Sequence, residues 1–521
     1  MILLCLAALL TLFLVKRVSN GHTLAEVPGP RMPSWLFGHG LQLQKAPVGA
    51  MYNRWAQRYG PTYKIGGAFG TLKLVLGDPK GAAHVLSSSN FVRPAAGRRM
   101  LVQFFGESLF STEGDEHRRQ RSVLNSAFTL ASVRDVSNVI FDLAKNLAIT
   151  WEEELDKSTE ETGQIIEITG PIHRVALDAI SMTAFAYDVG NSDHSIPELI
   201  SKISNVPQSP VTLLASALAD VLPVLTRLPS PMKEWTTMLR TELGRIADEV
   251  WSQAQESSGP MFHSKLLDSM NGAEEIHGVE MSRDRAIAQI VGVLFAGYET
   301  TANVIGECLY ELARCPQVQE KLRKELVQFI SKTGREPTFD DLFIGTQLPY
   351  LDAVTRETLR TKAVLMVIAR EAVEHDKIPL LFPTHGVGSP YVLVNPGQIV
   401  YIPVRDGINV DKTIWGPDAG VFRPERWLED GALPDTVNSI HAPGHLMTFG
   451  DGPKICLGRN FAIAEFKIVV STLVRHFTFA PDRQLYDFYR TGGNTVKPKV
   501  RGREHEGVQL SLCISKFHTD E

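Results

Sequence analysis

The chain begins with an uncharged, strongly apolar segment, residues 1–15, and its first basic residues are Lys16 and Arg17. As a helix this segment would reach roughly 22 Å, which is shorter than the ~30 Å hydrocarbon core of a bilayer. Signal peptides usually carry positive charge before the apolar run, whereas here it follows. We therefore expect an uncleaved membrane anchor with the body of the protein on the cytosolic side. A cleaved signal peptide and an interfacial helix are the alternatives.

Prolines at positions 28, 30 and 33 follow the apolar segment. Proline fixes φ and cannot continue a helix, so residues 16–34 read as a basic, stiff hinge. No linker, repeat or low-complexity block follows, and we expect residues 35–521 to form a single domain.

Two further patterns stand out in the body of the chain. Residues 62–79 alternate as two strands around a glycine turn, and their glycines do not form a nucleotide-binding G-x-G-x-x-G motif. Residues from about 118 to 330 are mostly helical in pattern. Within them, residues 205–235 are apolar and rich in proline, which indicates either core packing or a second surface that contacts membrane or substrate.

A long apolar helix is predicted at residues 283–314, with Ser282 as the N-cap and Pro316 as the stop. Its middle reads Ala-Gly-Tyr-Glu-Thr-Thr, residues 296–301. A carboxylate beside two hydroxyls is costly in a buried helix unless it is paired or used, and Gly297 is expected to leave a gap beside the backbone. Threonines that bond back to helix carbonyls are the simpler explanation.

Composition describes an ordinary globular protein: 521 residues, 44% hydrophobic, 21% charged, with a net charge of −5. The near-neutral charge gives no sign of nucleic-acid binding. Five cysteines, an odd and sparse set, do not form a disulfide framework. One of them, Cys456, lies between glycines just before an apolar helix.

Three short motifs carry candidate chemistry. Residues 449–458 fit F-G-x-G-x-x-x-C-x-G, with Phe449, Gly450, Cys456 and Gly458 at the defining positions. Glu357 and Arg360 are three apart on one helical face, where a weak surface pair is the plain reading, and Arg426 could complete a buried Glu–Arg–Arg network with them. Residues 114–128 start a basic helix that could equally be a solvated face.

Together these motifs resemble the cytochrome P-450 family of haem-thiolate monooxygenases, in its membrane-bound eukaryotic and particularly fungal form. The resemblance runs from about residue 26 to the end. It implies a mainly α fold with a smaller β region around a buried haem b. It also implies Cys456 as the thiolate ligand, within a loop formed by Phe449, Gly450 and Gly458. A thiolate ligand favours O–O cleavage.

The resemblance assigns roles to further residues. Glu299 and Thr300 would relay protons to dioxygen beside Ala296. The haem carboxylates would meet Arg121, His117, Arg370 and Lys454. His117 stands where the family usually has Trp. Lys454 stands where it usually has Arg, and lysine keeps the positive charge but cannot make the paired hydrogen bonds of a guanidinium group.

The implied reaction inserts one atom of O2 into a lipophilic molecule, in secondary metabolism or the oxidation of foreign compounds. Electrons would come from NADPH through a separate NADPH–cytochrome reductase, with cytochrome b5 as a further candidate donor and Arg118 and Arg119 as candidate docking residues. The implied location is the endoplasmic reticulum membrane, single-pass, with a cytosolic catalytic domain. An O2-independent isomerase or dehydratase and a non-catalytic haem binder are the alternatives.

Overall fold

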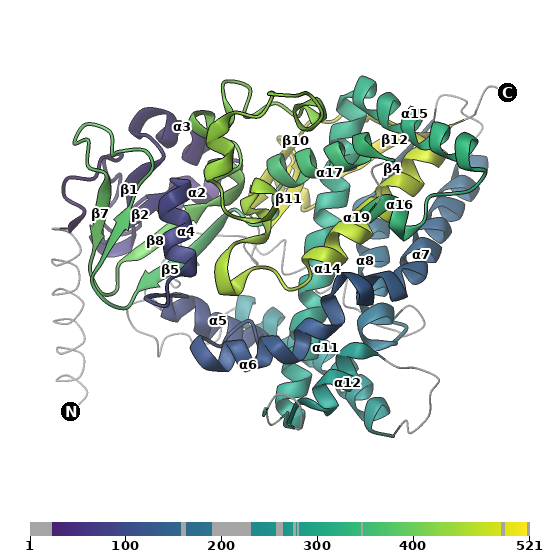
Figure 1. Cartoon of the computed structure of the whole chain (residues 1–521), viewed down its shortest axis with the longest axis horizontal. Helices are drawn as coiled ribbons and strands as arrows, with labels where there is room; N and C mark the ends of the chain where they lie inside the picture. The colour runs from purple at the N-terminus through teal and green to yellow at the C-terminus, as the bar shows by residue number, and fades with distance from the viewer. Residues whose placement is uncertain are drawn as a thin grey trace.

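A computed structural model describes residues 23–157, 163–189, 231–256, 264–274, 278, 281–344, 347–490 and 495–517. Figure 1 shows one group of strands and short helices on one side of the molecule and the long helices on the other, with further strands beside and among the long helices. The expected mainly α fold with a smaller β region is confirmed.

The described α-helices range from 4 residues in α18 to 32 residues in α14. The α-helices are α2 (Gly40–Lys45), α3 (Ala50–Tyr59), α4 (Pro79–Ser87), α5 (Ala95–Phe105), α6 (Gly114–Asn125), α7 (Leu130–Asp156), α8 (Thr169–Phe185), α11 (Pro231–Glu256), α12 (Lys265–Asn271), α14 (Arg283–Arg314), α15 (Pro316–Thr333), α16 (Phe339–Phe343), α17 (Pro349–Thr361), α18 (Lys412–Trp415) and α19 (Arg459–His476).

The strands form small sheets. The strands are β1 (Thr62–Gly66), β2 (Leu72–Leu76), β3 (Phe91–Val92), β4 (Gln164–Glu167), β5 (Val367–Ala372), β6 (Asp376–Pro379), β7 (Tyr391–Val394), β8 (Ile399–Pro403), β9 (Phe477–Pro481), β10 (Tyr486–Arg490), β11 (Val496–Val500) and β12 (Ser511–Lys516). The largest sheet has the order β1-β2-β8-β5-β3, and the others are β4-β12-β9, β6-β7 and β10-β11. Only the β2–β8 pairing is parallel among the described strands.

The glycine-turn hairpin is confirmed. β1 and β2 pair antiparallel, with Thr62 opposite Leu76 and Gly66 opposite Leu72. A short 3-10 turn, Ala68–Gly70, joins them.

The long helix is confirmed at the predicted bounds, and it crosses the helical part of the molecule (Figure 1). It begins after Ser282, and it ends before Pro316 because a residue preceding proline is driven out of the helical region. Cys315 there has φ −122° and ψ 70°. Most of the helix is buried, as its apolar pattern requires.

The prediction of a gap beside the backbone at Gly297 is wrong, because Ile180 of α8 fills that space. A Cβ built there would lie 2.7 Å from Cγ1 of Ile180 on α8. The missing side chain therefore lets α14 pack closely against α8. The sequence shows that Gly297 has no side chain, but it cannot show whether another residue occupies the space beside it.

Some predictions fall outside the described residues: the segment 1–15, and residues 205–230 of the apolar segment, whose last residues begin α11 at Pro231. Among the helices of the described residues, none combines the length and apolar character needed to cross a membrane.

Candidate functional site

The loop before α19 presents Cys456. The loop is turned by Gly450 (φ +74°) and Gly452 (φ +68°), and a Cβ at Gly452 would lie 2.3 Å from the carbonyl oxygen of Leu86. The Cys456 N–H donates to the carbonyl of Phe449 at 2.8 Å, which closes the loop. Only glycine adopts these backbone angles readily beside another chain segment.

The Cys456 side chain is accessible, yet it lies in dense protein surroundings. An accessible atom so surrounded faces a hollow inside the molecule. Desolvation raises the pKa of this thiol, whereas the Gly458 amide and the charges of Arg121 and Arg459 act to lower it. These three groups favour the thiolate, which is the form that binds metals.

Helix α6 lies against this loop through Arg121. Its Nη1 donates to the carbonyl oxygen of Ile455 at 2.7 Å. His117, one turn earlier, is buried, with 3% of its surface exposed. The predicted pair on α6 therefore lies at the loop of Cys456.

A cluster of cations adjoins these residues. The charges of Lys454, Arg93 and Arg121, after desolvation, lower the pKa of His117 to about 4. Desolvation and the charge of Arg93 likewise lower the pKa of Lys454 to about 8 and that of Arg370 to about 10. Each pKa is lowered, which favours the uncharged form, because these groups are partly removed from water and lie close to other cations.

Among the described residues, the carboxylate that pairs with these cations is that of Glu113. Lys454 donates to Glu113 at 2.9 Å and to the Thr112 carbonyl at 2.9 Å. The nearest guanidinium nitrogen of Arg93, Nη1, is 3.7 Å from Glu113 and has no hydrogen-bond partner although it is buried. Buried charges are normally paired.

The arrangement therefore fits a flat cofactor that carries two carboxylates. Glu113 balances only part of the positive charge of this cluster, so Arg93, Arg121 and Arg370 would meet the carboxylates. The accessible sulfur of Cys456 lies nearby on the glycine loop. These are the features that haem b requires of its protein.

A second group of residues lies in the middle of α14. Ala296 and Thr300 are partly exposed although most of the helix is buried. The Thr300 hydroxyl donates to the Ala296 carbonyl at 2.8 Å, as the simpler explanation of the threonine pair predicts. Its oxygen lone pairs can still accept a hydrogen bond.

Aromatic rings lie beside these residues. Phe295 of α14 packs against Phe104 and Phe105 of α5, with ring centroids 6.2 and 5.4 Å apart, and Phe110 packs on Phe105 at 5.5 Å. This cluster gives the α5–α14 contact an apolar surface.

Glu299 is buried, and one of its two carboxylate oxygens accepts two hydrogen bonds. Its Oε1 accepts from Lys497 Nζ at 2.9 Å and from the Thr495 hydroxyl at 2.9 Å. Desolvation acts to raise the pKa of Glu299, but Lys497, together with His173, holds it below the ordinary value. Its Oε2 has no partner among the described residues.

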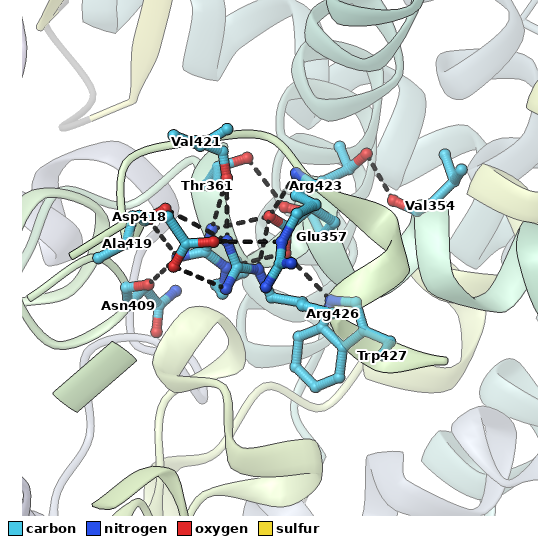
Figure 2. A network of polar contacts seen from close by, with 12 residues as sticks. Val354, Glu357, Thr361, Asn409, Asp418, Ala419, Val421, Arg423, Arg426 and Trp427 are labelled. Carbon is cyan, nitrogen blue, oxygen red and sulfur yellow. Dashed lines mark hydrogen bonds and ion pairs between the residues drawn. The ribbon is translucent and has the colours of Figure 1, made fainter. Parts of the chain in front are cut away.

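Glu357, Arg360 and Arg426 form a buried network rather than a surface pair (Figure 2). Arg360 donates to both Glu357 oxygens at 2.8 Å, Arg426 Nε donates at 3.0 Å, and the Trp427 indole donates at 3.0 Å. Arg360 also reaches the carbonyl oxygen of Ala419 at 2.6 Å. The network fixes α17 to the segment before the cysteine loop.

Sequence reasoning missed Arg93, Glu113 and Lys497. Arg93 precedes Pro94 in a stretch with no helical or strand period, and Lys497 lies nearly two hundred residues from Glu299. The two candidate docking residues of α6, Arg118 and Arg119, are exposed and pair with Asp115 and Glu116 on the same helix.

Comparison with known proteins places the chain among characterised sequences. Residues 27–502 match the family model described as Cytochrome P-450. The chain is 34% identical to the cytochrome P-450 monooxygenase claW of Ampulloclitocybe clavipes, over 97% of this chain and 95% of that protein. It is 31% identical to the cytochrome P-450 monooxygenase 205 of Postia placenta, over 95% of this chain and 93% of that protein.

Proposed function

The chain belongs to the cytochrome P-450 family and is a monooxygenase, and from that premise we propose that it inserts one oxygen atom of O2 into a lipophilic small molecule. The observation that carries this proposal is the accessible Cys456 sulfur on a glycine loop beside buried cations that lack enough carboxylate partners.

Cys456 would supply the thiolate ligand, and Arg93, Arg121 and Arg370 would hold the haem carboxylates. When bound, haem supplies the activation of O2. Phe449, which is partly buried against the core, would limit water near the sulfur. Lys454 and His117 would act indirectly, Lys454 by holding Glu113 and His117 by filling the space between the cations.

Thr300 and Glu299 of α14 would hold and transfer protons for the reaction. The Thr300 hydroxyl is held by the Ala296 carbonyl, so it keeps one orientation and offers its lone pairs to a donor. Glu299 keeps one oxygen bound to Lys497 and the other unpaired. A carboxyl group held in this way can accept and release a proton without losing its position.

The aromatic contact of α5 and α14 supports an apolar substrate. An apolar pocket positions an unactivated C–H bond mainly by shape. We propose that the enzyme serves secondary metabolism or the oxidation of foreign compounds, since it is similar to fungal monooxygenases.

Electrons would come from a separate membrane-bound NADPH–cytochrome reductase, with cytochrome b5 as a second donor. The exposed Arg118 and Arg119 on α6, the helix that also carries Arg121, would offer positive charge to an acidic partner. We further propose that residues 1–15 anchor the protein in the endoplasmic reticulum with residues 35–521 as one cytosolic domain. Deletion of residues 1–25 should then move the protein from the membrane pellet to the supernatant.

The test of the site is Cys456→Ala in the full chain. We expect the variant to lose bound haem or the red-shifted carbon monoxide band of the reduced protein. An unchanged band would refute the ligand assignment. Cys315→Ala, at a partly buried cysteine outside the loop, is the control and should keep the band.

The test of the reaction is a screen of lipophilic compounds with purified protein, NADPH and reductase. Mass spectrometry should find products that gain one oxygen, and that gain should require both NADPH and the reductase. Product formation without either would favour an isomerase or dehydratase. Spectral binding without turnover would favour a non-catalytic haem binder.

A further inference from the structure

A small cavity lies between α8, α14 and β11. It is lined by His173 and Thr169 from α8, by Asn303 and Gly306 from α14, and by Pro498 from β11. The volume open to a water molecule in this cavity is about 10 Å³, which is close to the lower limit for holding one water. Thr169 is partly exposed although its Oγ1 is buried, so this residue lies between the cavity and the surface at the start of α8.

Three polar atoms at this cavity have no partner among the described residues: Nε2 of His173, Nδ2 of Asn303 and Oγ1 of Thr169. His173 and Asn303 are 6% and 5% exposed. Buried polar groups nearly always have a hydrogen-bond partner, in the protein or in ordered water. Three unpaired atoms around one cavity therefore point to an ordered water.

The chemistry of these atoms matches one water molecule. Nδ1 of His173 lies 2.8 Å from the Thr169 carbonyl oxygen, which can only accept, so Nδ1 carries the proton and Nε2 is an acceptor. Desolvation and the charge of Lys497 lower the pKa of His173 to about 4, so the ring is neutral at physiological pH. The amide nitrogen of Asn303 is a donor, and the Thr169 hydroxyl can donate or accept.

Glu299 precedes the cavity-lining residues of α14 by about one helical turn. Asn303 follows Glu299 by four residues, which places both on one face of the helix. The His173 ring packs on Tyr298 at a centroid distance of 5.1 Å, and the negative charge of Glu299 is close enough to oppose part of the lowering of the His173 pKa. Oε2 of Glu299 is buried without a partner among the described residues, one helical turn before the cavity-lining Asn303.

The other acid at the cavity is already committed. Glu307 accepts from Arg405 Nη1 at 2.7 Å and from Nη2 at 2.5 Å, and both side chains are buried. Both oxygens of Glu307 therefore already accept a hydrogen bond from Arg405.

We propose that one ordered water occupies this cavity, held by His173, Asn303 and Thr169, and that it carries protons from the surface to Oε2 of Glu299. In each transfer the water gives one proton to the carboxylate and regains one from solvent beyond Thr169, and no electrons move. His173 and Asn303 are positioning residues, because they act through Glu299. The inference rests on the proposed function, of which the Glu299–Thr300 relay is part.

The first measurement is a crystal structure of the holoenzyme at a resolution that locates ordered waters. We expect a water within hydrogen-bond distance of His173 Nε2 and Asn303 Nδ2. A dry cavity would overturn the proposal. This result does not depend on turnover, so it stays separate from the monooxygenase assay.

The second measurement fills the cavity with Gly306→Ala. A Cβ there would meet only Leu510, at 3.9 Å, so the variant should fold. We expect the water to disappear and the hydrogen peroxide released per NADPH consumed with reductase to rise several-fold. The control is Gly244→Ala on α11, where a Cβ meets nothing within 4 Å. This variant should keep the ordered water and the wild-type level of peroxide release.

A third variant pair separates positioning from packing. His173→Leu removes the acceptor, whereas His173→Gln can keep one near the position of Nε2. We expect a several-fold rise in peroxide release and a larger solvent deuterium isotope effect for the leucine variant, with partial rescue in the glutamine variant. If Gly306→Ala loses the water while peroxide release stays at the wild-type level, the relay is overturned and the monooxygenase assignment stands.

Discussion

Arg121 donates a hydrogen bond of 2.7 Å to the carbonyl oxygen of Ile455, the residue before Cys456, across 334 positions of sequence. One guanidinium group therefore both fixes the cysteine loop to α6 and places positive charge beside the sulfur, as its effect on the Cys456 pKa shows. The proximal loop and the cation cluster are thus parts of one structure.

Arg121→Gln should weaken both functions of this side chain. A charged hydrogen bond to a partly buried acceptor contributes about 1.5–3 kcal/mol, so we expect a lower haem-to-protein ratio after purification and a lower thermal midpoint. Arg118→Gln, on the exposed face of the same helix, is the control and should match the wild type. Full haem occupancy in Arg121→Gln would contradict the proposed role.

Thr300→Ala should raise the peroxide released per NADPH consumed. The hydroxyl is held by the Ala296 carbonyl and is the group on this stretch that can bind a water or an incoming oxygen. Thr300→Ser keeps the hydroxyl and should stay close to wild type. Peroxide release is measured with reductase and NADPH, and tight coupling in the alanine variant would remove Thr300 from the relay.

Glu357→Gln should destabilise the fold strongly. Glu357 and Arg360 have fully buried side chains, and Arg426 is 1% exposed. Among the described residues, loss of the negative charge therefore leaves Arg360 without an ion-pair partner and leaves Arg426 paired with Asp418 alone. Breaking such a pair costs about 3–5 kcal/mol, which denaturant unfolding can measure. The control is Asp115→Asn, in an exposed pair with Arg118, whose cost should stay below about 1 kcal/mol.

The parts that the sequence predicts well are local. The bounds of α14 follow from Ser282 and Pro316, and the β1–β2 hairpin follows from its glycine turn, because capping, proline and turn chemistry act within a few residues. The Thr300 bond to Ala296 is likewise an i to i−4 contact. The cysteine loop was identifiable because its glycine spacing is specific.

The parts that escaped prediction depend on contacts between distant segments. Lys497 approaches Glu299 only because β11 packs beside α14, and no local pattern marks that lysine as a partner. Arg93 joins the cations through Glu113, twenty residues away. Charge and residue type are visible in a sequence, but the partner of a buried charge is set by tertiary packing.

Gly297→Ala should destabilise the protein through α8. The added methyl would lie 2.7 Å from Ile180 Cγ1 and 3.0 Å from its Cβ, so a branched side chain must shift. Overpacking of this kind costs typically about 1–3 kcal/mol. Ile180→Ala should offset part of that cost in the double variant, and a purely additive double-mutant cycle would contradict the close contact.

Asp406 should make stability depend on pH. It is 9% exposed with an unpaired Oδ2, and desolvation raises its pKa from 3.8 to about 6, although Arg405 opposes the shift. A carboxyl group whose pKa is higher in the folded state is protonated more in that state, so the free energy of unfolding falls as pH rises from 3.8 to about 6 and levels off above that value. Between about pH 5 and about pH 7 we expect the wild type to lose roughly 1 kcal/mol relative to Asp406→Asn, measured by urea unfolding of the holoenzyme. Parallel curves for the two proteins would show that Asp406 is ionised at both pH values.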